Sequence, residues 1–274
     1  MAVPSTVLGK PLKSYKGRGI TSRQDIGVSL FEAEPGTGIV FVVKNAEGGD
    51  DDKILLPARA EYVVNTLRNV VVGQGKTRLC LVEHILCAVA LAGVDDLYIE
   101  VEGPEVPLGN GSGDFWMDLL ESAGLKKEPP QATIELKQPI VINRKDRSLM
   151  AIPDETFSVS YLMDWKHPKI GRVWRSWTQA EGVGEILNAR TFGSLAEHKM
   201  LGLENDVVSM TEDGFTMDLR FDDEPVRHKL LDLVGDLMLC GINPLKIKAR
   251  FISIKGGHEM DVEMAKQLQQ ALKQ

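Results

Sequence analysis

The segment Lys126-Lys127-Glu128-Pro129-Pro130 divides the sequence into two halves that show the same order of predicted elements. It is short and polar, and its prolines end a helix, which is typical of a linker. On each side we expect strands, a helix, a strand, a glycine-rich loop and a second helix. This order predicts an α+β fold of two tandem similar domains, residues 1–127 and 131–274, each a sheet with two helices, with the helices packed between the sheets.

Hydrophobic patterns and turn residues locate the elements of each half. Residues 26–43 alternate loosely around Pro35-Gly36-Thr37-Gly38, which predicts a hairpin. The other predicted strands lie within 53–81 and at 96–102, 132–143, 147–152, 156–163, 172–178 and 245–254. The predicted helices run from Val82 to Ala92, from about Asp114 to Ala123, from Pro225 to Cys240 and from about Asp261 onward.

Composition and charge exclude several classes of protein. The 274 residues carry a net charge of −7, which argues against a general nucleic-acid or anionic-membrane binder. No apolar run is long enough for a membrane span, and residues 1–20 lack the apolar region of a signal peptide, so we expect a cytoplasmic protein. Cys80, Cys87 and Cys240 are odd in number and form no CxxC pair, which argues against a disulfide framework or a thiolate zinc site.

The stretch from Pro225 to Asp236 carries three polar side chains at helical spacing. His228, Asp232 and Asp236 stand at i, i+4 and i+8, so they share one face of the predicted helix. An imidazole and a carboxylate four residues apart can bind one metal ion, zinc or iron(II). The alternative is an exposed helix with an ordinary His/Asp pair, although the leucines around these residues favour burial.

Glu83 and His84 begin an otherwise apolar predicted helix. A catalytic zinc site commonly has three protein ligands and an open position for water, so His84 is a candidate third ligand. Glu83 could then take a proton from the water. The alternative is a glutamate that stabilises the helix N-terminus through the macrodipole.

His258 follows an apolar strand and a diglycine, in Lys255-Gly256-Gly257-His258. The glycines predict a tight loop that presents His258 as a general acid, with Asp236 to orient it or raise its pKa. The alternative is a turn with an exposed histidine. His167 in a polar turn, His198 on a charged face and Glu105 in a loop are interpreted as structural or solvated.

Together these motifs resemble the UDP-3-O-acyl-N-acetylglucosamine deacetylases, which commit a sugar nucleotide to lipid A synthesis. The matching strings are collinear and span nearly the whole chain, which makes the set specific although each string alone is weak. They are Thr37-Gly38-Ile39-Val40-Phe41, Val82-Glu83-His84-Ile85-Leu86, Glu105-Val106-Pro107, Asn110-Gly111-Ser112-Gly113, Ala189-Arg190-Thr191-Phe192, Glu224-Pro225-Val226-Arg227-His228-Lys229, Asp232 with Gly235-Asp236, and Gly256-Gly257-His258.

The resemblance implies a role for each matching residue. One Zn²⁺ per chain would be bound by His84, His228 and Asp232. Glu83 would activate water, and His258, with Asp236 behind it, would protonate the leaving amine. Thr191 would help to stabilise the oxyanion. The residues implied in substrate binding are Phe192 as an aromatic contact, with Lys229 and Lys255 near the phosphates.

The chain also departs from the family pattern. Thr21 stands where the family has a histidine, and Asn110 where it has an aspartate. After Phe192 the family has a longer segment that helps to build an acyl-chain passage, whereas here only residues 202–208 join a helix to the next strand. We hypothesise a shorter or more open passage and a preference for a short acyl group, such as acetyl, or for a different amino-sugar.

Two other functions compete with the deacetylase of lipid A synthesis. One is a related zinc deacetylase that acts on another N-acetylated sugar, and the other is a non-catalytic sugar-nucleotide binding protein. A binding protein has little use for both a base and an acid, which disfavours it. A dehydrogenase is disfavoured because no GxGxxG follows a strand and opens a helix. The expected partner is a small UDP-amino-sugar, and the protein is expected to be a monomer.

Overall fold

The computed structural model describes residues 2–3, 8–48 and 52–272. Its first large sheet has six strands in the order β1-β5-β4-β9-β3-β2. These are β1 (Ala2–Val3), β2 (Lys13–Arg18), β3 (Asp25–Phe31), β4 (Ile39–Lys44), β5 (Lys53–Pro57) and β9 (Leu97–Glu102). The connection from β5 to the first helix contains the 3-10 helix η1 (Ala60–Tyr62) and a three-stranded sheet of β6 (Val63–Asn65), β7 (Val71–Gln74) and β8 (Thr77–Cys80).

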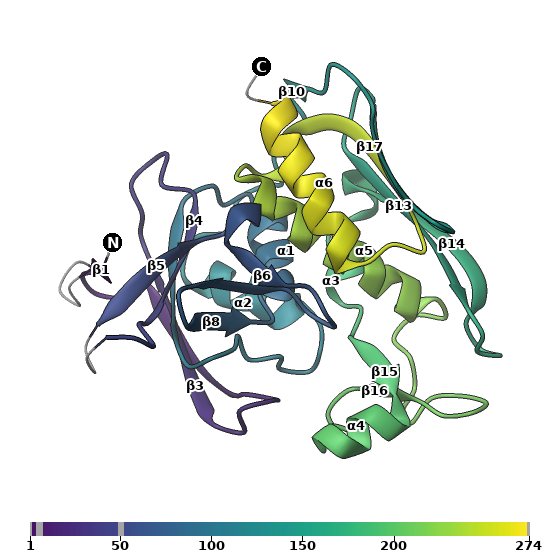
Figure 1. Cartoon of the computed structure of the whole chain (residues 1–274), viewed down its shortest axis with the longest axis horizontal. Helices are drawn as coiled ribbons and strands as arrows, with labels where there is room; N and C mark the ends of the chain where they lie inside the picture. Colours follow the sequence, from purple (N-terminus) through teal and green to yellow (C-terminus); the bar gives the residue numbers. More distant parts are fainter. Residues whose placement is uncertain (1, 4–7, 49–51, 273–274) are drawn as a thin grey trace.

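The second large sheet is built from the other half of the chain, in the order β11-β12-β17-β13-β14, with β10 paired to β17. Its strands are β10 (Ile134–Glu135), β11 (Ile140–Arg144), β12 (Arg147–Pro153), β13 (Ser158–Trp165), β14 (Gly171–Thr178) and β17 (Ile247–Ile254). A small unit of β15 (Phe192–Ser194), α4 (Leu195–Leu201) and β16 (Val208–Met210) projects from it (Figure 1). Short helices complete this half: η2 (Gln179–Glu181), α3 (Gly184–Leu187), η3 (Met238–Cys240) and η4 (Pro244–Lys246).

The longer helices lie between the two large sheets (Figure 1). They are α1 (Glu83–Leu91), α2 (Asp114–Ser122), α5 (Glu224–Leu237) and α6 (His258–Ala271). Side chains along β17 alternate between buried and more exposed, because successive residues of a strand point to opposite faces and one face meets the helices. This arrangement confirms the predicted α+β fold. No helix of the described residues is both long and apolar enough to cross a membrane.

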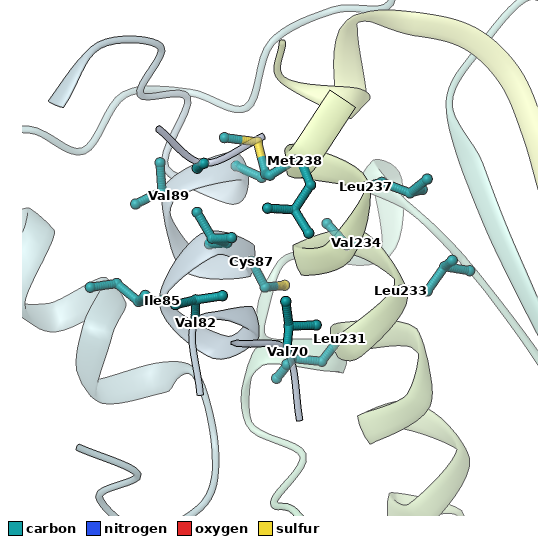
Figure 2. Close-up of a cluster of buried hydrophobic side chains, with 14 of the residues drawn as sticks. Val70, Val82, Ile85, Cys87, Val89, Leu231, Leu233, Val234, Leu237 and Met238 are labelled. Carbon is teal, nitrogen blue, oxygen red and sulfur yellow. The ribbon is translucent and has the colours of Figure 1, made fainter. Parts of the chain in front are cut away.

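The packing of α1 against α5 forms the centre of the core (Figure 2). Every residue of α1 is buried, so this helix is apolar all round except at its first two positions. Figure 2 shows Cys87 of α1 facing Val234 of α5, while Leu233 and Leu237 point away from α1, and α5 also packs on β13. Full burial of a leucine or valine side chain stabilises the fold by about 1.5–3 kcal/mol.

Gly235 allows α1 and α5 to approach closely. A Cβ atom built at this position would lie 2.1 Å from the Glu83 carbonyl oxygen and 3.3 Å from the Cys87 backbone nitrogen. Both neighbours are backbone atoms of α1 and cannot move aside as a flexible side chain could. The glycine therefore sets the distance between the two helices that carry Glu83, His84, His228 and Asp232.

Replacing Gly235 by alanine is expected to lower the free energy of unfolding by at least about 1–3 kcal/mol, the usual effect of overpacking. For a chain of this size each kcal/mol lowers Tm by about 2–4 °C. The sign is diagnostic, because alanine in an ordinary helix interior stabilises by about 1 kcal/mol relative to glycine. Thermal unfolding measures it, with Gly214→Ala as the control, since a Cβ at Gly214 meets only Thr211 Oγ1 at 3.7 Å. A Gly235→Ala variant as stable as the parent would contradict the close approach.

The predicted hairpin over residues 26–43 is wrong. Both strands form, but β9 lies between β3 and β4: it pairs antiparallel with β3 and parallel with β4. The turn at residues 35–38 therefore begins a crossover rather than a hairpin loop. The alternation of apolar residues identifies a strand but not its partner, and β9, with buried residues on both faces, takes the central position.

The start of the terminal helix and the division into two domains are the other predicted boundaries. The terminal helix α6 begins at His258 rather than near Asp261, so His258 lies in its first turn and is not presented by a loop. The division into domains 1–127 and 131–274 stays a prediction, since one hydrophobic core includes residues of both halves, such as Ile85 and Leu233.

Candidate metal and catalytic site

Two imidazoles and a carboxylate meet where α1 crosses α5. His84 comes from the first turn of α1, and His228 and Asp232 are one turn apart on α5. Asp232 Oδ1 lies 3.4 Å from His228 Nε2 and 3.8 Å from His84 Nε2. Ligand atoms bound to one tetrahedral zinc ion at its usual bond lengths are about 3.4 Å apart, so the spacing fits a shared ion.

The protonation states of the two histidines suit metal ligands. The pKa of His84 is lowered to about 3, chiefly by burial. The neighbouring His228 also lowers this pKa, and Asp232 opposes the shift only in part. Burial also lowers the pKa of His228. His228 Nδ1 lies 3.0 Å from the Ala189 carbonyl oxygen, which can only accept, so Nδ1 donates and Nε2 keeps its lone pair.

Asp232 remains ionised in this buried place. Burial alone would raise its pKa, but Lys229 and the nearby imidazoles hold it far below the ordinary value. Lys229 Nζ donates to Asp232 Oδ2 at 2.6 Å, which leaves Oδ1 directed at the histidines. Among the described residues, His84, His228 and Asp232 thus form a buried group that could hold one divalent cation, and the buried His84 Nδ1 has no hydrogen-bond partner there.

Glu83 is placed beside this group by the same turn of α1. Its side chain is buried, and burial raises its pKa to about 7, an effect that His258 partly opposes. Glu83 Oε2 accepts a hydrogen bond from the Val70 backbone N–H at 3.1 Å. A carboxylate whose pKa lies near neutrality can accept and release a proton at physiological pH.

His258 and Asp236 form a buried pair on the neighbouring helices α6 and α5. His258 Nδ1 donates to Asp236 Oδ2 at 2.7 Å. Burial alone would lower the pKa of His258, but the Asp236 carboxylate raises it to about 10. The imidazole is therefore protonated near neutral pH, and the bond to Asp236 leaves its Nε2–H able to donate.

The residues of both groups line one cavity of about 440 Å³. Glu83, His84, His228, Asp232 and His258 share it with Thr191, Phe192 and Lys229, so eight of the ten residues singled out from the sequence lie on its wall, and Asp236 stands directly behind His258. One side of the wall is apolar. That side is made of Ile20, Leu81, Leu108, Leu201, Leu203 and Val207.

The tenth residue, Lys255, is not among those that line the cavity. It has a positive φ of 54° directly before the diglycine. Its Nζ pairs with Asp146 at 2.5 Å and with Asp164 at 3.9 Å. The structure thus places Lys255 at the protein surface beside two carboxylates.

A buried ion pair fixes the loop that carries Thr191. Glu224, at the start of α5, accepts hydrogen bonds from the Arg190 backbone N–H at 2.9 Å and from Arg190 Nε at 2.8 Å. The Thr191 N–H donates to the Gly111 carbonyl oxygen at 2.7 Å. The matching strings around residues 111, 190 and 224 therefore act together, by holding Thr191 on the cavity wall.

Sequence reasoning missed several residues of this region. His198 is buried rather than on a charged face, and its Nδ1 lies 2.7 Å from Ser209 Oγ. Glu105 is buried and accepts hydrogen bonds from the backbone N–H groups of Thr21 and Ser22. Trp165 packs against Phe192 at the cavity, with ring centroids 5.2 Å apart and the rings tilted by 56°. Glu105 lies in one of the matching strings, but no periodic or motif signal marks the buried roles of His198 and Trp165.

A buried His₂Asp group beside an acid and a base, within a cavity, is typical of metal-dependent hydrolases. The comparison with known proteins agrees: the family model for UDP-3-O-acyl N-acetylglycosamine deacetylase matches residues 7–270. The chain belongs to this family. It is 35% identical to the UDP-3-O-acyl-N-acetylglucosamine deacetylase of Thermosynechococcus vestitus, over 93% of this chain and 91% of that protein. It is 32% identical to the protein of the same name from Coxiella burnetii, over 92% of this chain and 86% of the other.

Proposed function

We propose that this protein hydrolyses the N-acetyl amide of a UDP-3-O-acyl-N-acetylglucosamine, in lipid A synthesis, with one zinc ion held by His84, His228 and Asp232. The observation that carries the proposal is the convergence of this group, the Glu83 carboxylate and the His258–Asp236 pair on one cavity. Family membership supports the substrate class.

The chemistry divides among a few groups. Zinc, when bound, polarises the amide carbonyl and lowers the pKa of a water molecule. Glu83 takes a proton from the attacking water, which its pKa of about 7 allows. His258 then donates the proton on Nε2 to the amine nitrogen as the C–N bond breaks, since an amine leaves poorly without a proton. Thr191 Oγ1 donates a hydrogen bond to the carbonyl oxygen as negative charge builds on it.

The rest of the cavity suits a sugar that carries an acyl chain. Phe192 and Trp165 offer an aromatic surface, and the apolar wall offers a place for the 3-O-acyl group. Lys229 Nζ lies 5.8 Å from the Phe192 ring centroid and donates a hydrogen bond to Asp232. We therefore propose that Lys229 orients the Asp232 carboxylate as well as contacting the substrate. Lys255 would contact a phosphate only in competition with Asp146 and Asp164.

Removal of the metal tests the proposal. The zinc-loaded protein is expected to release acetate from UDP-3-O-acyl-N-acetylglucosamine, to lose this activity after chelation and to regain it when zinc is added. Acetate release and metal content, measured on the same samples, check this. Full activity in demonstrably metal-free protein would contradict the metal role, and substrate binding without acetate release would support the sugar-nucleotide binding alternative.

The acyl group is tested with a panel of 3-O-acyl chain lengths and with UDP-N-acetylglucosamine itself. Because only residues 202–207 join α4 to β16, we predict that kcat/KM favours a short acyl group. In a passage long enough to bury the acyl chain, each additional methylene of the chain would raise kcat/KM roughly fourfold, because its burial contributes about 0.8 kcal/mol. A short passage ends this gain after the first few methylenes. A kcat/KM that rises steadily to the long chains would contradict a shortened passage.

A further inference from the structure

A second carboxyl group lies beside the His258–Asp236 pair. Asp261 stands one turn after His258 on α6 and is 1% exposed. Oxygen or nitrogen atoms of Asp236, His258 and Asp261 all lie within 4.8 Å of one another. Figure 1 shows α6 running beside α5, which brings these side chains together. Nothing in the proposed reaction uses Asp261.

Three buried oxygen atoms in this place have no hydrogen-bond partner among the described residues. They are Asp236 Oδ1, Asp261 Oδ1 and Ser253 Oγ, from α5, α6 and β17. Asp236 uses its other oxygen for His258. A Cβ atom built at Gly256 would lie 2.3 Å from Ser253 Oγ and 3.8 Å from Asp261 Oδ1, so both oxygens face the same glycine. Buried polar atoms are nearly always paired. The Ser253 hydroxyl can donate to only one of the two carboxylate oxygens, so this group requires a further donor.

Two carboxyl groups this close in a buried place cannot both be ionised, since their charges repel without water to screen them. Asp236 keeps its charge because it accepts a hydrogen bond from the protonated His258 ring. No cationic side chain of the described residues is hydrogen-bonded to Asp261. A proton on Asp261 would provide the missing donor, and Asp236 Oδ1 or Ser253 Oγ would accept it.

We propose that Asp261 is a positioning residue for the acid: it carries a proton and donates a hydrogen bond to Asp236, directly or through Ser253, and so holds the Asp236 carboxylate against His258. The role rests on the proposed function of His258. It concerns orientation only, because Asp261 is not among the residues that line the cavity.

The charged groups around Asp261 agree with this state. Burial raises the pKa of Asp261 to about 8; the Asp236 carboxylate raises it as well, and Asp232 adds to this, while His258 and Lys229 oppose it. Tyr161 on β13, whose own pKa is raised by burial, faces the same region. The N-terminal turn of α6 favours the ionised form, but more weakly than burial and Asp236 disfavour it. The proton should therefore be present at neutral pH and be lost as the pH rises through about 8.

The test compares the full-length, zinc-loaded protein with three variants. Asp261→Asn keeps the size and an N–H donor, Asp261→Ala removes both, and Glu259→Gln removes one negative charge from an exposed position of the same helix. At pH 7 we expect kcat within about twofold of the parent for Asp261→Asn and Glu259→Gln. For Asp261→Ala we expect kcat to fall about 10- to 100-fold with KM little changed, as for other residues that orient a site group.

The pH profile of kcat separates positioning from a purely structural role. The parent should lose activity in a step near pH 8, when Asp261 ionises, whereas Asp261→Asn should keep its activity until His258 titrates near pH 10. The proposal is overturned if Asp261→Asn is as impaired as Asp261→Ala, or if it keeps the step near pH 8. If Asp261→Ala does not fold, the profile of Asp261→Asn still decides.

Nuclear magnetic resonance of the His258 ring nitrogens gives a second measurement that needs no activity. Their shifts should change near pH 8 in the parent and not in Asp261→Asn, with His258→Gln used to assign the signals. A parent protein that deacetylates no substrate would refute the proposed function alone. Identical ring titrations in the parent and in Asp261→Asn would refute the role of Asp261 alone.

Discussion

Replacing Glu83 by glutamine is expected to lower kcat for acetate release about 10²- to 10⁴-fold, the usual contribution of a general base. The amide has the same size but cannot accept a proton from water. Its carbonyl oxygen can still accept the hydrogen bond from the Val70 N–H, so Tm should change little. Steady-state kinetics at saturating substrate measures the effect, and KM should stay within a few-fold of the parent.

Two measurements keep this result interpretable. Metal analysis must show an equal zinc content in both proteins, because Glu83 is adjacent to His84. Glu61→Gln, at an exposed position in η1, is the matched control for loss of a glutamate charge and should leave kcat unchanged. If a fully metallated Glu83→Gln protein retained more than a tenth of the parent's kcat, another group would have to be the base.

Replacing His228 by alanine is expected to weaken zinc binding by at least about 10²-fold and to abolish turnover at ordinary zinc concentrations. Structural zinc sites with four ligands bind with about 10–16 kcal/mol, or about 2.5–4 kcal/mol for each ligand. The change also removes the bond between Nδ1 and Ala189. Titration with zinc against a competing chelator gives the dissociation constant, and it requires no substrate.

His167→Ala is the matched control for this substitution. His167 lies in the turn after β13 and bonds to the Thr211 carbonyl oxygen at 3.0 Å, outside the residues that line the cavity. Its loss should leave zinc affinity unchanged. Equal zinc affinity in His228→Ala and in the parent would place the metal elsewhere.

More of the site's residues than of the sheets' strand pairing could be predicted from the sequence. His228, Asp232 and Asp236 share a helix face because the period of the α-helix fixes their directions, and the structure shows this face buried. His84 is a candidate third ligand from zinc-site chemistry and from the family resemblance, since no local rule brings α1 to α5. The close crossing of the two helices depends on Gly235, whose part in the packing appears only when both helices are present.

The errors have a common physical origin. The hairpin over residues 26–43 failed because the partner of a strand is chosen by the whole sheet, and β9 enters between β3 and β4 from 50 or more residues away. In the sequence, Asp261 marks only the approximate start of the predicted terminal helix. Its significance comes from Asp236 and Ser253, which lie on two other elements. The role near the phosphates that the resemblance implies for Lys255 stays a prediction, and its Nζ pairs with Asp146 at the surface.

The central claim is that His84, His228 and Asp232 bind one zinc ion. It is tested most directly by crystals of the purified protein measured on both sides of the zinc absorption edge. The account predicts a single anomalous peak at about 2.0–2.2 Å from one nitrogen of each histidine and one Asp232 oxygen. No zinc peak there in zinc-saturated crystals, or a peak bound only by other residues, would contradict it.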